Sequence, residues 1–291
     1  MSVISFDLSN KIDQRIVKIF YVLKKVADSL NIPFFVVGAF ARDLILEYSY
    51  DIKSPRGTLD IDLGVEVAAW EHFEAFKDSL ITKEKFSETD KKHRLQLGNV
   101  FVDIIPFGRI ADVNKKISWP PEHEIIMGII GFKEAYECSI TVRLSIDPEI
   151  DIKVSSLPGL AIMKIVSWKE KYPERSRDAQ DLLFIMQKYW EAGNFDRLYE
   201  VEQSLLTEEE FDVQSAGIRL LGRDMATISD LETFRALKAI LDDEVGDQRQ
   251  YNLVTDMIKK IPMGDEKFDK VSLQVEKLRK GFVEVGEKRY D

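Results

Sequence analysis

The sequence has very little cysteine, and its single thiol, Cys138, excludes a disulfide framework. A chain without disulfides suits a reducing compartment, so we expect a cytoplasmic location. Histidine is also rare, since His72, His93 and His123 are scattered and form no zinc-binding spacing. The fold must therefore depend on an ordinary hydrophobic core.

Long hydrophobic runs are missing as well. The longest, Ile125–Phe132, is far shorter than the ~20 apolar residues of a membrane span, and no basic-then-apolar signal segment opens the chain. We therefore expect no membrane partner. The net charge of −10 argues against indiscriminate binding to nucleic acid, but a local basic groove is compatible with it.

Acidic residues, in contrast, are spaced in a pattern that indicates a metal-binding role. In the segment Thr58–Leu63, the strand period of two puts Asp60 and Asp62 on one face and turns Leu59 toward the core. Two adjacent carboxylates repel each other unless a cation lies between them, and Mg²⁺ prefers carboxylate oxygens. The pair predicts half of a metal site; the alternative is a solvent-facing strand edge.

A second acidic strand strengthens the metal interpretation. Arg94–Leu97 and Val100–Pro106 are expected to form a hairpin around the two-residue turn Gly98-Asn99. Asp103 then lies on a face that is otherwise apolar, where an unpaired charge is unfavourable. Three carboxylates on two strands are the arrangement that a two-metal phosphoryl-transfer site needs.

The first half of the chain alternates between helices and strands. A helix capped by Ser9 precedes the buried strand Phe34–Val37, and a further helix, Ala39–Glu47, follows Gly38 directly. A strand, a glycine and a helix N-terminus together let a phosphate approach backbone N–H groups. This alternation predicts an α/β sheet domain, with a late strand at Glu134–Leu144.

The pattern becomes almost wholly helical after Ser155, and we predict a sheet domain at 1–155 followed by an α-helical domain at 156–291. Capping boxes at Thr207 and Ser229 predict two of its helices. The helices expected in this half cover residues 208–225, 230–244, 248–261 and 266–283.

Lys164 is unusual, because helical spacing puts it on the apolar face of its own helix. Asp178 and Asp181 share the inward stripe of the next helix and could pair with it. Two interpretations stay open: a buried ion pair that joins two helices, or a lysine that contacts an anionic ligand.

Taken together, these motifs resemble the DNA polymerase β-type nucleotidyltransferase superfamily: Val37-Gly38-Ala39, Asp60-Ile61-Asp62-Leu63 and Val102-Asp103-Ile104. Two further motifs, Leu160–Lys164 and Arg177–Leu182, make the chain similar to the AbiEii/AbiGii-type nucleotidyltransferases, which include toxins of type IV toxin–antitoxin pairs. The chain departs from the superfamily pattern at Ala39, where Gly or Ser is usual, and by an insertion at Tyr48–Arg56.

The resemblance implies a role for each matched residue. It assigns Asp60, Asp62 and Asp103 as catalytic ligands of Mg²⁺ or Mn²⁺. It assigns the following residues to nucleotide binding: Gly38, Ala39, Arg42, Thr58, Lys164 and Asp181. Lys164 and Asp178 are also expected to be catalytic, with the nucleotide held between the two domains.

We therefore predict a metal-dependent nucleotidyltransferase that moves an NMP from an NTP to an acceptor hydroxyl and releases pyrophosphate. An RNA 3′ end is the expected acceptor, and an antitoxin protein is an expected partner. Basic residues at Lys91, Lys92 and Arg94, and at Lys169, Lys171, Arg175 and Arg177, could form the RNA path. The alternatives are an aminoglycoside-like small-molecule transferase and an inactive module that binds a nucleotide or a partner.

Overall fold

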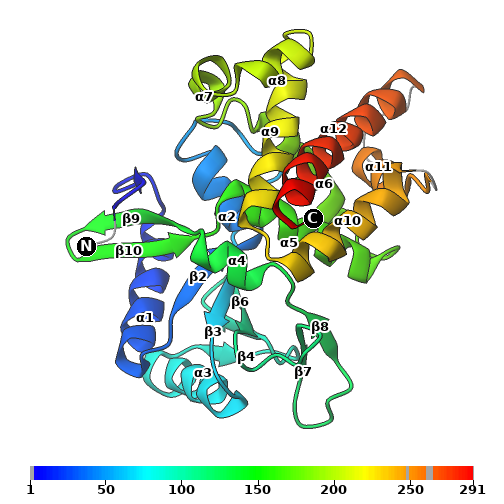
Figure 1. The fold of residues 1–291 in the computed structure, drawn as a ribbon. Coiled ribbons are helices and arrows are strands. Elements are labelled where there is room, and N and C mark those ends of the chain that lie inside the picture. Colours follow the sequence, from blue (N-terminus) through cyan, green and yellow to red (C-terminus); the bar gives the residue numbers. More distant parts are fainter. Residues whose placement is uncertain (1–2, 247–248, 260–264, 291) are drawn as a thin grey trace. The chain divides into compact units, whose positions relative to one another are not determined.

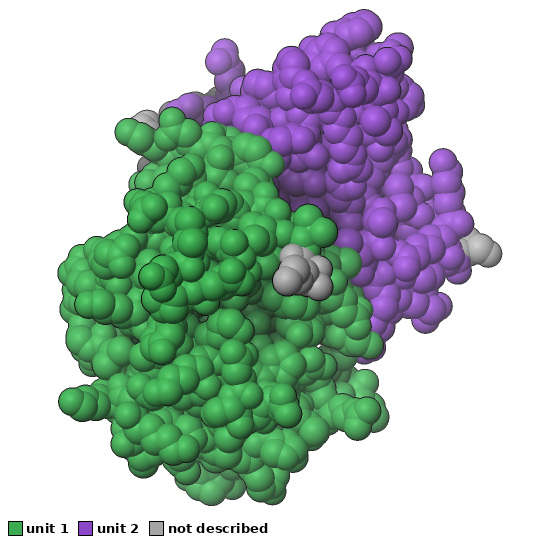
Figure 2. All heavy atoms as spheres, turned by 90° about the vertical axis from the view of Figure 1, so that its left-hand side faces the viewer, with its two compact units in different colours: residues 1–156 green, residues 157–291 purple. Residues whose placement is uncertain are grey.

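The computed structural model describes residues 3–246, 249–259 and 265–290. The chain divides into two compact units, Met1–Ser156 and Leu157–Asp291, which Figure 2 colours separately. The first unit is built on a sheet and the second is helical (Figure 1), so the predicted mixed α/β fold class is confirmed. Among the described helices, none is both long enough and apolar enough to span a membrane.

The sheet of the first unit has eight strands in the order β1-β9-β10-β2-β3-β6-β5-β4. Its strands are β1 (Phe6–Asp7), β2 (Phe34–Val37), β3 (Ile61–Glu66), β4 (Ser87–Glu88), β5 (Arg94–Leu97), β6 (Val100–Phe107), β9 (Ile140–Ile146) and β10 (Glu149–Val154). A separate two-stranded sheet pairs β7 (Lys116–Ser118) with β8 (Ile126–Gly128). At the centre, β3 runs parallel to β6 and antiparallel to β2, so the strands with the acidic motifs are neighbours.

Helices of the first unit are α1 (Gln14–Leu30), α2 (Gly38–Leu46), α3 (Trp70–Glu84) and α4 (Phe132–Glu137). Apolar residues of α1 and α3, such as Phe20 and Phe73, are fully buried. The ring of Phe35 on β2 packs against Phe132 and Tyr136 of α4, with ring centroids 6.4 and 5.5 Å apart. These rings form an aromatic cluster that covers part of the sheet.

Three local predictions in this unit are wrong. The acidic strand begins at Ile61 rather than Thr58, and Leu59 is 52% exposed because it precedes the paired part of β3. The strand expected at Glu134–Leu144 is split into α4 and β9, since Gly131 adopts a φ of 87° and opens a short helix. The first helix is capped by Asp13, whose side chain accepts a hydrogen bond from the Arg15 N–H, and not by Ser9.

The second unit contains the helices α5 (Leu157–Lys171), α6 (Arg177–Lys188), α7 (Phe195–Glu200), α8 (Gln203–Glu208), α9 (Val213–Ile228), α10 (Leu231–Val245), α11 (Asn252–Ile258) and α12 (Asp265–Tyr290). The helix predicted from residue 208 begins instead at Val213, because Asp212 provides the cap. Thr207 lies inside α8, where its hydroxyl donates to the Gln203 carbonyl. The ends of the helix predicted at 248–261, Gln248 and Ile261, lie outside the described residues.

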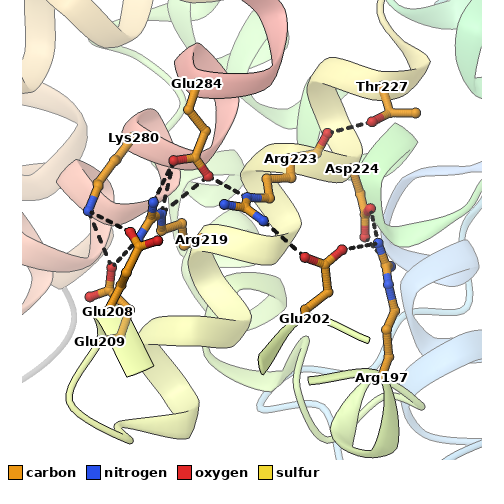
Figure 3. A network of polar contacts seen from close by, with 10 residues as sticks. All are labelled: Arg197, Glu202, Glu208, Glu209, Arg219, Arg223, Asp224, Thr227, Lys280 and Glu284. Carbon is orange, nitrogen blue, oxygen red and sulfur yellow. Dashed lines mark hydrogen bonds and ion pairs between the residues drawn. The ribbon is translucent and has the colours of Figure 1, made fainter. Parts of the chain in front are cut away.

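A network of ion pairs connects α7, α8, α9 and α12 (Figure 3). Arg219 of α9 is 3% exposed and contacts two carboxylates at the C-terminal end of α8, Glu208 at 2.7 Å and Glu209 at 3.0 Å. Arg219 also binds Glu284 of α12, which Arg223 contacts as well. Arginine is suited to this place because its planar group binds several carboxylates at once.

Candidate active site

The register of the central strands brings two of the predicted acids together. In the β3–β6 pair Asp62 lies directly opposite Asp103, and in the β2–β3 pair it lies opposite Val37. Residues paired across parallel strands point to the same face of a sheet, so both carboxylates project from one face. Both side chains are half-buried.

Gly38 lies directly against Asp62. Its φ of +70° is in the left-handed region, and a Cβ at this position would be 2.1 Å from Oδ2 of Asp62. Gly38 also begins α2, so the Asp62 carboxylate lies beside the positive end of a nine-residue helix. Only glycine allows the strand, the helix start and the carboxylate to come this close.

Asp60 precedes β3 and is half-buried; its backbone N–H donates to the hydroxyl of Thr58 at 3.1 Å. Thr58, predicted to bind the nucleotide, therefore contributes a hydroxyl to the turn that leads into the acidic strand. The negative charges of Asp60 and Asp62 both contribute to raising the pKa of Arg94.

Arg94, which sequence analysis assigned to a basic cluster for RNA, has a partner in this site that was not predicted. It faces Asp103 across the β5–β6 hairpin, where Nε donates to Oδ1 at 2.6 Å and Nη2 to Oδ2 at 2.7 Å. The pKa of Arg94 is raised, first by these hydrogen bonds and further by the charges of Asp103, Asp60 and Asp62, against the opposing effect of burial. Counting back from the Gly98-Asn99 turn would have found this pair, since Leu97 opposite Val100 puts Arg94 opposite Asp103.

The predicted metal ligands fit a metal only in part. Within residues 3–246, 249–259 and 265–290, no group of three or more His, Cys, Asp or Glu side chains is arranged to hold a metal ion. Both oxygens of Asp103 accept hydrogen bonds from Arg94. Asp60 and Asp62 remain suited to Mg²⁺, which often needs only one or two carboxylates together with substrate phosphates.

Arg42 is directed toward the inserted loop. It is 1% exposed; its Nε donates to Asp43 at 2.9 Å, and its Nη2 donates to the Ser54 hydroxyl at 2.6 Å and to the Arg56 carbonyl at 2.9 Å. These contacts fix the loop that leads into the acidic strand. Ala39, the second residue of α2, is half-buried.

Lys164 of the helical unit is 7% exposed and forms ion pairs with both acids of the next helix. Its Nζ lies 2.7 Å from Oδ1 of Asp178 and 2.8 Å from Oδ2 of Asp181, so the pair joins α5 to α6. Burial alone would lower the pKa of Lys164, but the charges of Asp178 and Asp181 outweigh it and raise that pKa. Burial raises the pKa of Asp178, but Lys164 and Arg175 outweigh that effect and hold it below its usual value.

A cavity of about 290 Å³ opens at the edge of the sheet that carries β4 and β5. Its walls combine basic side chains with an aromatic ring, and include Lys77, Lys91, Lys92, Arg94 and Trp119. Acidic residues line it too, at Glu74, Glu88 and Asp90. Arg94 lines the cavity, whereas Asp60, Asp62 and Asp103 do not.

Comparison with known proteins gives one family. A family described as nucleotidyl transferase AbiEii toxin, type IV TA system, matches residues 22–274. No curated protein matches the chain.

Several solved structures resemble this chain, each at low sequence identity and low TM-score. The antibiotic-resistance factor ANT(2'')-Ia is 14% identical, with a TM-score of 0.34 over 68% of this chain and 98% of that one. A CCA-adding enzyme in complex with ATP is 19% identical, with a TM-score of 0.32 over 89% of this chain and 66% of that one. The Thermotoga maritima CCA-adding enzyme complexed with tRNA is 15% identical, with a TM-score of 0.30 over 97% of this chain and 84% of that one.

Proposed function

This chain belongs to the AbiEii family of nucleotidyl transferases, the toxins of type IV toxin–antitoxin systems, and we propose that it transfers an NMP from an NTP to the 3′ end of an RNA. The observation that carries the proposal is the pairing of Asp62 with Asp103 beside Gly38 and the N-terminus of α2. A triphosphate needs backbone N–H groups and acidic metal ligands side by side, and this end of the sheet has both.

In the proposed reaction, the acceptor hydroxyl oxygen attacks the α-phosphorus, the bond to the β-phosphate oxygen breaks, and pyrophosphate leaves. Mg²⁺ or Mn²⁺, held by Asp60 and Asp62, would neutralise charge on the triphosphate. Asp103, the third predicted metal ligand, would help to activate the attacking hydroxyl and would accept its proton. Gly38 and Ala39 would present N–H groups to the phosphates, and Thr58 would order the Asp60 turn.

The roles that the resemblance gives to Arg42, Lys164, Asp178 and Asp181 stay predictions. Arg42 would act indirectly, by fixing the inserted loop. An RNA acceptor is supported by the basic, partly aromatic cavity at the β4–β5 edge of the sheet, because RNA binding combines cations with ring faces. The family implies an antitoxin partner, and a cytoplasmic location is proposed because NTPs and RNA are found there.

The test incubates the protein with each labelled NTP and total RNA, with and without Mg²⁺. We expect labelled RNA only with the metal, and no labelling by Asp60→Ala or Asp62→Ala in proteins that still unfold cooperatively. Glu66→Ala is the matched control, since Glu66 lies on β3 on the same face as Asp62 but is exposed at the other end of the strand. Labelling of a small molecule alone would support the aminoglycoside-like alternative, and NTP binding without any transfer would support the inactive module.

A further inference from the structure

The Arg94–Asp103 pair has the geometry of a complete ion pair. Two parallel N–H···O bonds of 2.6 and 2.7 Å use both carboxylate oxygens, and charge-assisted pairs of this forked kind are the strong ones. The guanidinium carbon also lies 4.9 Å from the centroid of the Phe101 ring, which holds its plane in place. The side chains of Arg94 and Asp103 are 20% and 14% exposed, so the pair is partly accessible to solvent.

The charge around the pair explains why an arginine is found there. Asp62 lies opposite Asp103 in the strand register, and Asp60 and Asp62 both act on Arg94. Without a cation, these carboxylates would repel one another and weaken the folded state. Arg94 therefore supplies the positive charge that a bound metal ion would otherwise provide.

Arginine also recognises phosphate in the same way that it recognises carboxylate, through its planar fork of N–H donors. A triphosphate beside Gly38 would offer Arg94 such a partner, and Asp103 would then be released. Carboxylate and phosphate thus compete for one guanidinium.

We propose that Arg94 neutralises the acidic cluster of Asp60, Asp62 and Asp103 in the nucleotide-free protein. Arg94 keeps Asp103 from binding a metal ion until nucleotide phosphates bind Arg94 in place of Asp103. The inference rests on the proposed function, because it takes Asp60, Asp62 and Asp103 as the metal ligands. In the nucleotide-free protein the metal site then consists of Asp60 and Asp62 alone. Asp103 joins it only when the nucleotide is present.

The first test measures Mn²⁺ binding to the nucleotide-free full chain, by electron paramagnetic resonance of the free ion. We expect Asp103→Asn to change the affinity of the parent by less than about twofold, since Arg94 already holds Asp103. Arg94→Gln should tighten binding by about tenfold, because a hydrogen-bonded charge pair no longer competes. The double variant Arg94→Gln/Asp103→Asn should return to the parent affinity, which shows coupling between the two positions.

The chain offers a matched control in Arg143 and Asp151. They form a cross-strand pair of the same kind in the same sheet, with N–H···O distances of 2.7 and 2.8 Å. Arg143→Gln should leave Mn²⁺ affinity unchanged. Arg94→Lys keeps the charge but cannot fork across both oxygens, so an intermediate affinity is expected, and this variant decides the matter if Arg94→Gln fails to fold.

The second test repeats the titrations with a non-hydrolysable NTP analogue. Asp103→Asn should now weaken Mn²⁺ binding by at least about tenfold in the parent background. If Asp103→Asn weakens binding equally with and without the analogue, Asp103 is never withheld and the inference is wrong. If Arg94→Gln and Arg143→Gln bind Mn²⁺ like the parent, the inference is also wrong, although the proposed function survives provided that Asp62→Asn abolishes binding. If no variant binds Mn²⁺ in either titration, the proposed function fails as well.

Discussion

At the scale of single residues, Gly38 is the position where the backbone and the acidic cluster depend on each other most directly. We predict that Gly38→Ala lowers transfer by about 100-fold, because the new Cβ would be 2.1 Å from Oδ2 of Asp62 and must displace that carboxylate. The left-handed φ of +70° adds a destabilisation of about 1–2 kcal/mol. Transfer rate and thermal unfolding measured on the same preparation give both effects.

Gly98→Ala separates the two effects. Gly98 also has a left-handed φ, +63°, but nothing lies within 4 Å of the position that its Cβ would occupy. This control should be destabilised by a similar amount and keep full activity. If both variants lose activity equally, backbone strain and not the displacement of Asp62 is responsible.

Single residues also show which features the sequence predicted and which it did not. The alternation of buried and polar residues predicted Asp103 correctly on a strand, and the hairpin turn at Gly98 is confirmed. The Arg94 partner was missed because basic residues were grouped by sequence proximity, whereas the contact is set by cross-strand register. Leu59 was expected inside because its strand was started three residues too early.

At the scale of helices, the Lys164 pair joins α5 to α6. We predict that Lys164→Ala lowers the free energy of unfolding by about 3–5 kcal/mol, since it leaves Asp178 and Asp181 buried without their cation. Urea unfolding measures this loss, and Lys188→Ala is the control, since the half-buried Lys188–Glu191 pair is far less enclosed than the Lys164 pair and should contribute less than about 1 kcal/mol. NTP affinity is measured in parallel: unchanged stability with lost NTP binding would favour the ligand-binding interpretation.

The pH dependence of this pair follows from its pKa shifts. The pKa of Asp178 is held below its ordinary value of 3.8, so its stabilisation is present above pH 3.8 and is lost as the pH falls through the lower folded value. The pKa of Lys164 is raised above 10.5, so its stabilisation is present below pH 10.5 and is lost as the pH rises through the higher folded value. We predict that Asp178→Asn is less acid-sensitive than the parent below pH 3.8; unfolding curves that run parallel there would contradict this prediction.

The network around Arg219 acts on four elements at once. We predict that Arg219→Met lowers the free energy of unfolding by about 3–5 kcal/mol, because Glu209 is 5% exposed and loses a buried partner. Arg15→Met should change it by less than about 1 kcal/mol, because the Arg15–Asp13 pair is exposed. If chemical denaturation shows that both variants lose the same free energy of unfolding, burial of the network contributes nothing to stability.

Elements differ in how far the sequence predicts them. Helix α1 was predicted from its continuous apolar stripe, because burial of one face fixes the period. Helix α10 was predicted from the capping box at Ser229, although the side chain that caps it belongs to Asp230. The short helix α4 was not predicted, because its Phe132 and Tyr136 pack against Phe35 and Phe107, which are distant in sequence. The break between α8 and α9 was missed because a serine-or-threonine cap pattern also occurs inside helices, as at Thr207.

At the scale of the whole molecule, an acidic protein must bind RNA through few, well-placed cations. The net charge is −10, and several candidate cations already have partners: Lys92 with Glu122, Lys169 with Asp243 and Arg175 with Asp178. Lys171 and Arg177, in contrast, are exposed at the end of α5 and the start of α6. They are therefore the better candidates for contacts with RNA phosphates.

We predict that Lys171→Glu/Arg177→Glu lowers RNA labelling at least about tenfold while NTP binding is unchanged. Labelling by the parent should fall steeply with salt, and the slope against log salt should drop by about 0.7 for each phosphate contact removed. Lys18→Glu/Lys83→Glu is the control, because it changes the net charge equally at two other exposed lysines. If the control loses labelling to the same degree, general repulsion between RNA and an acidic protein explains the effect. If neither variant loses labelling, RNA phosphates do not bind at the α5–α6 connection, and another surface holds the acceptor.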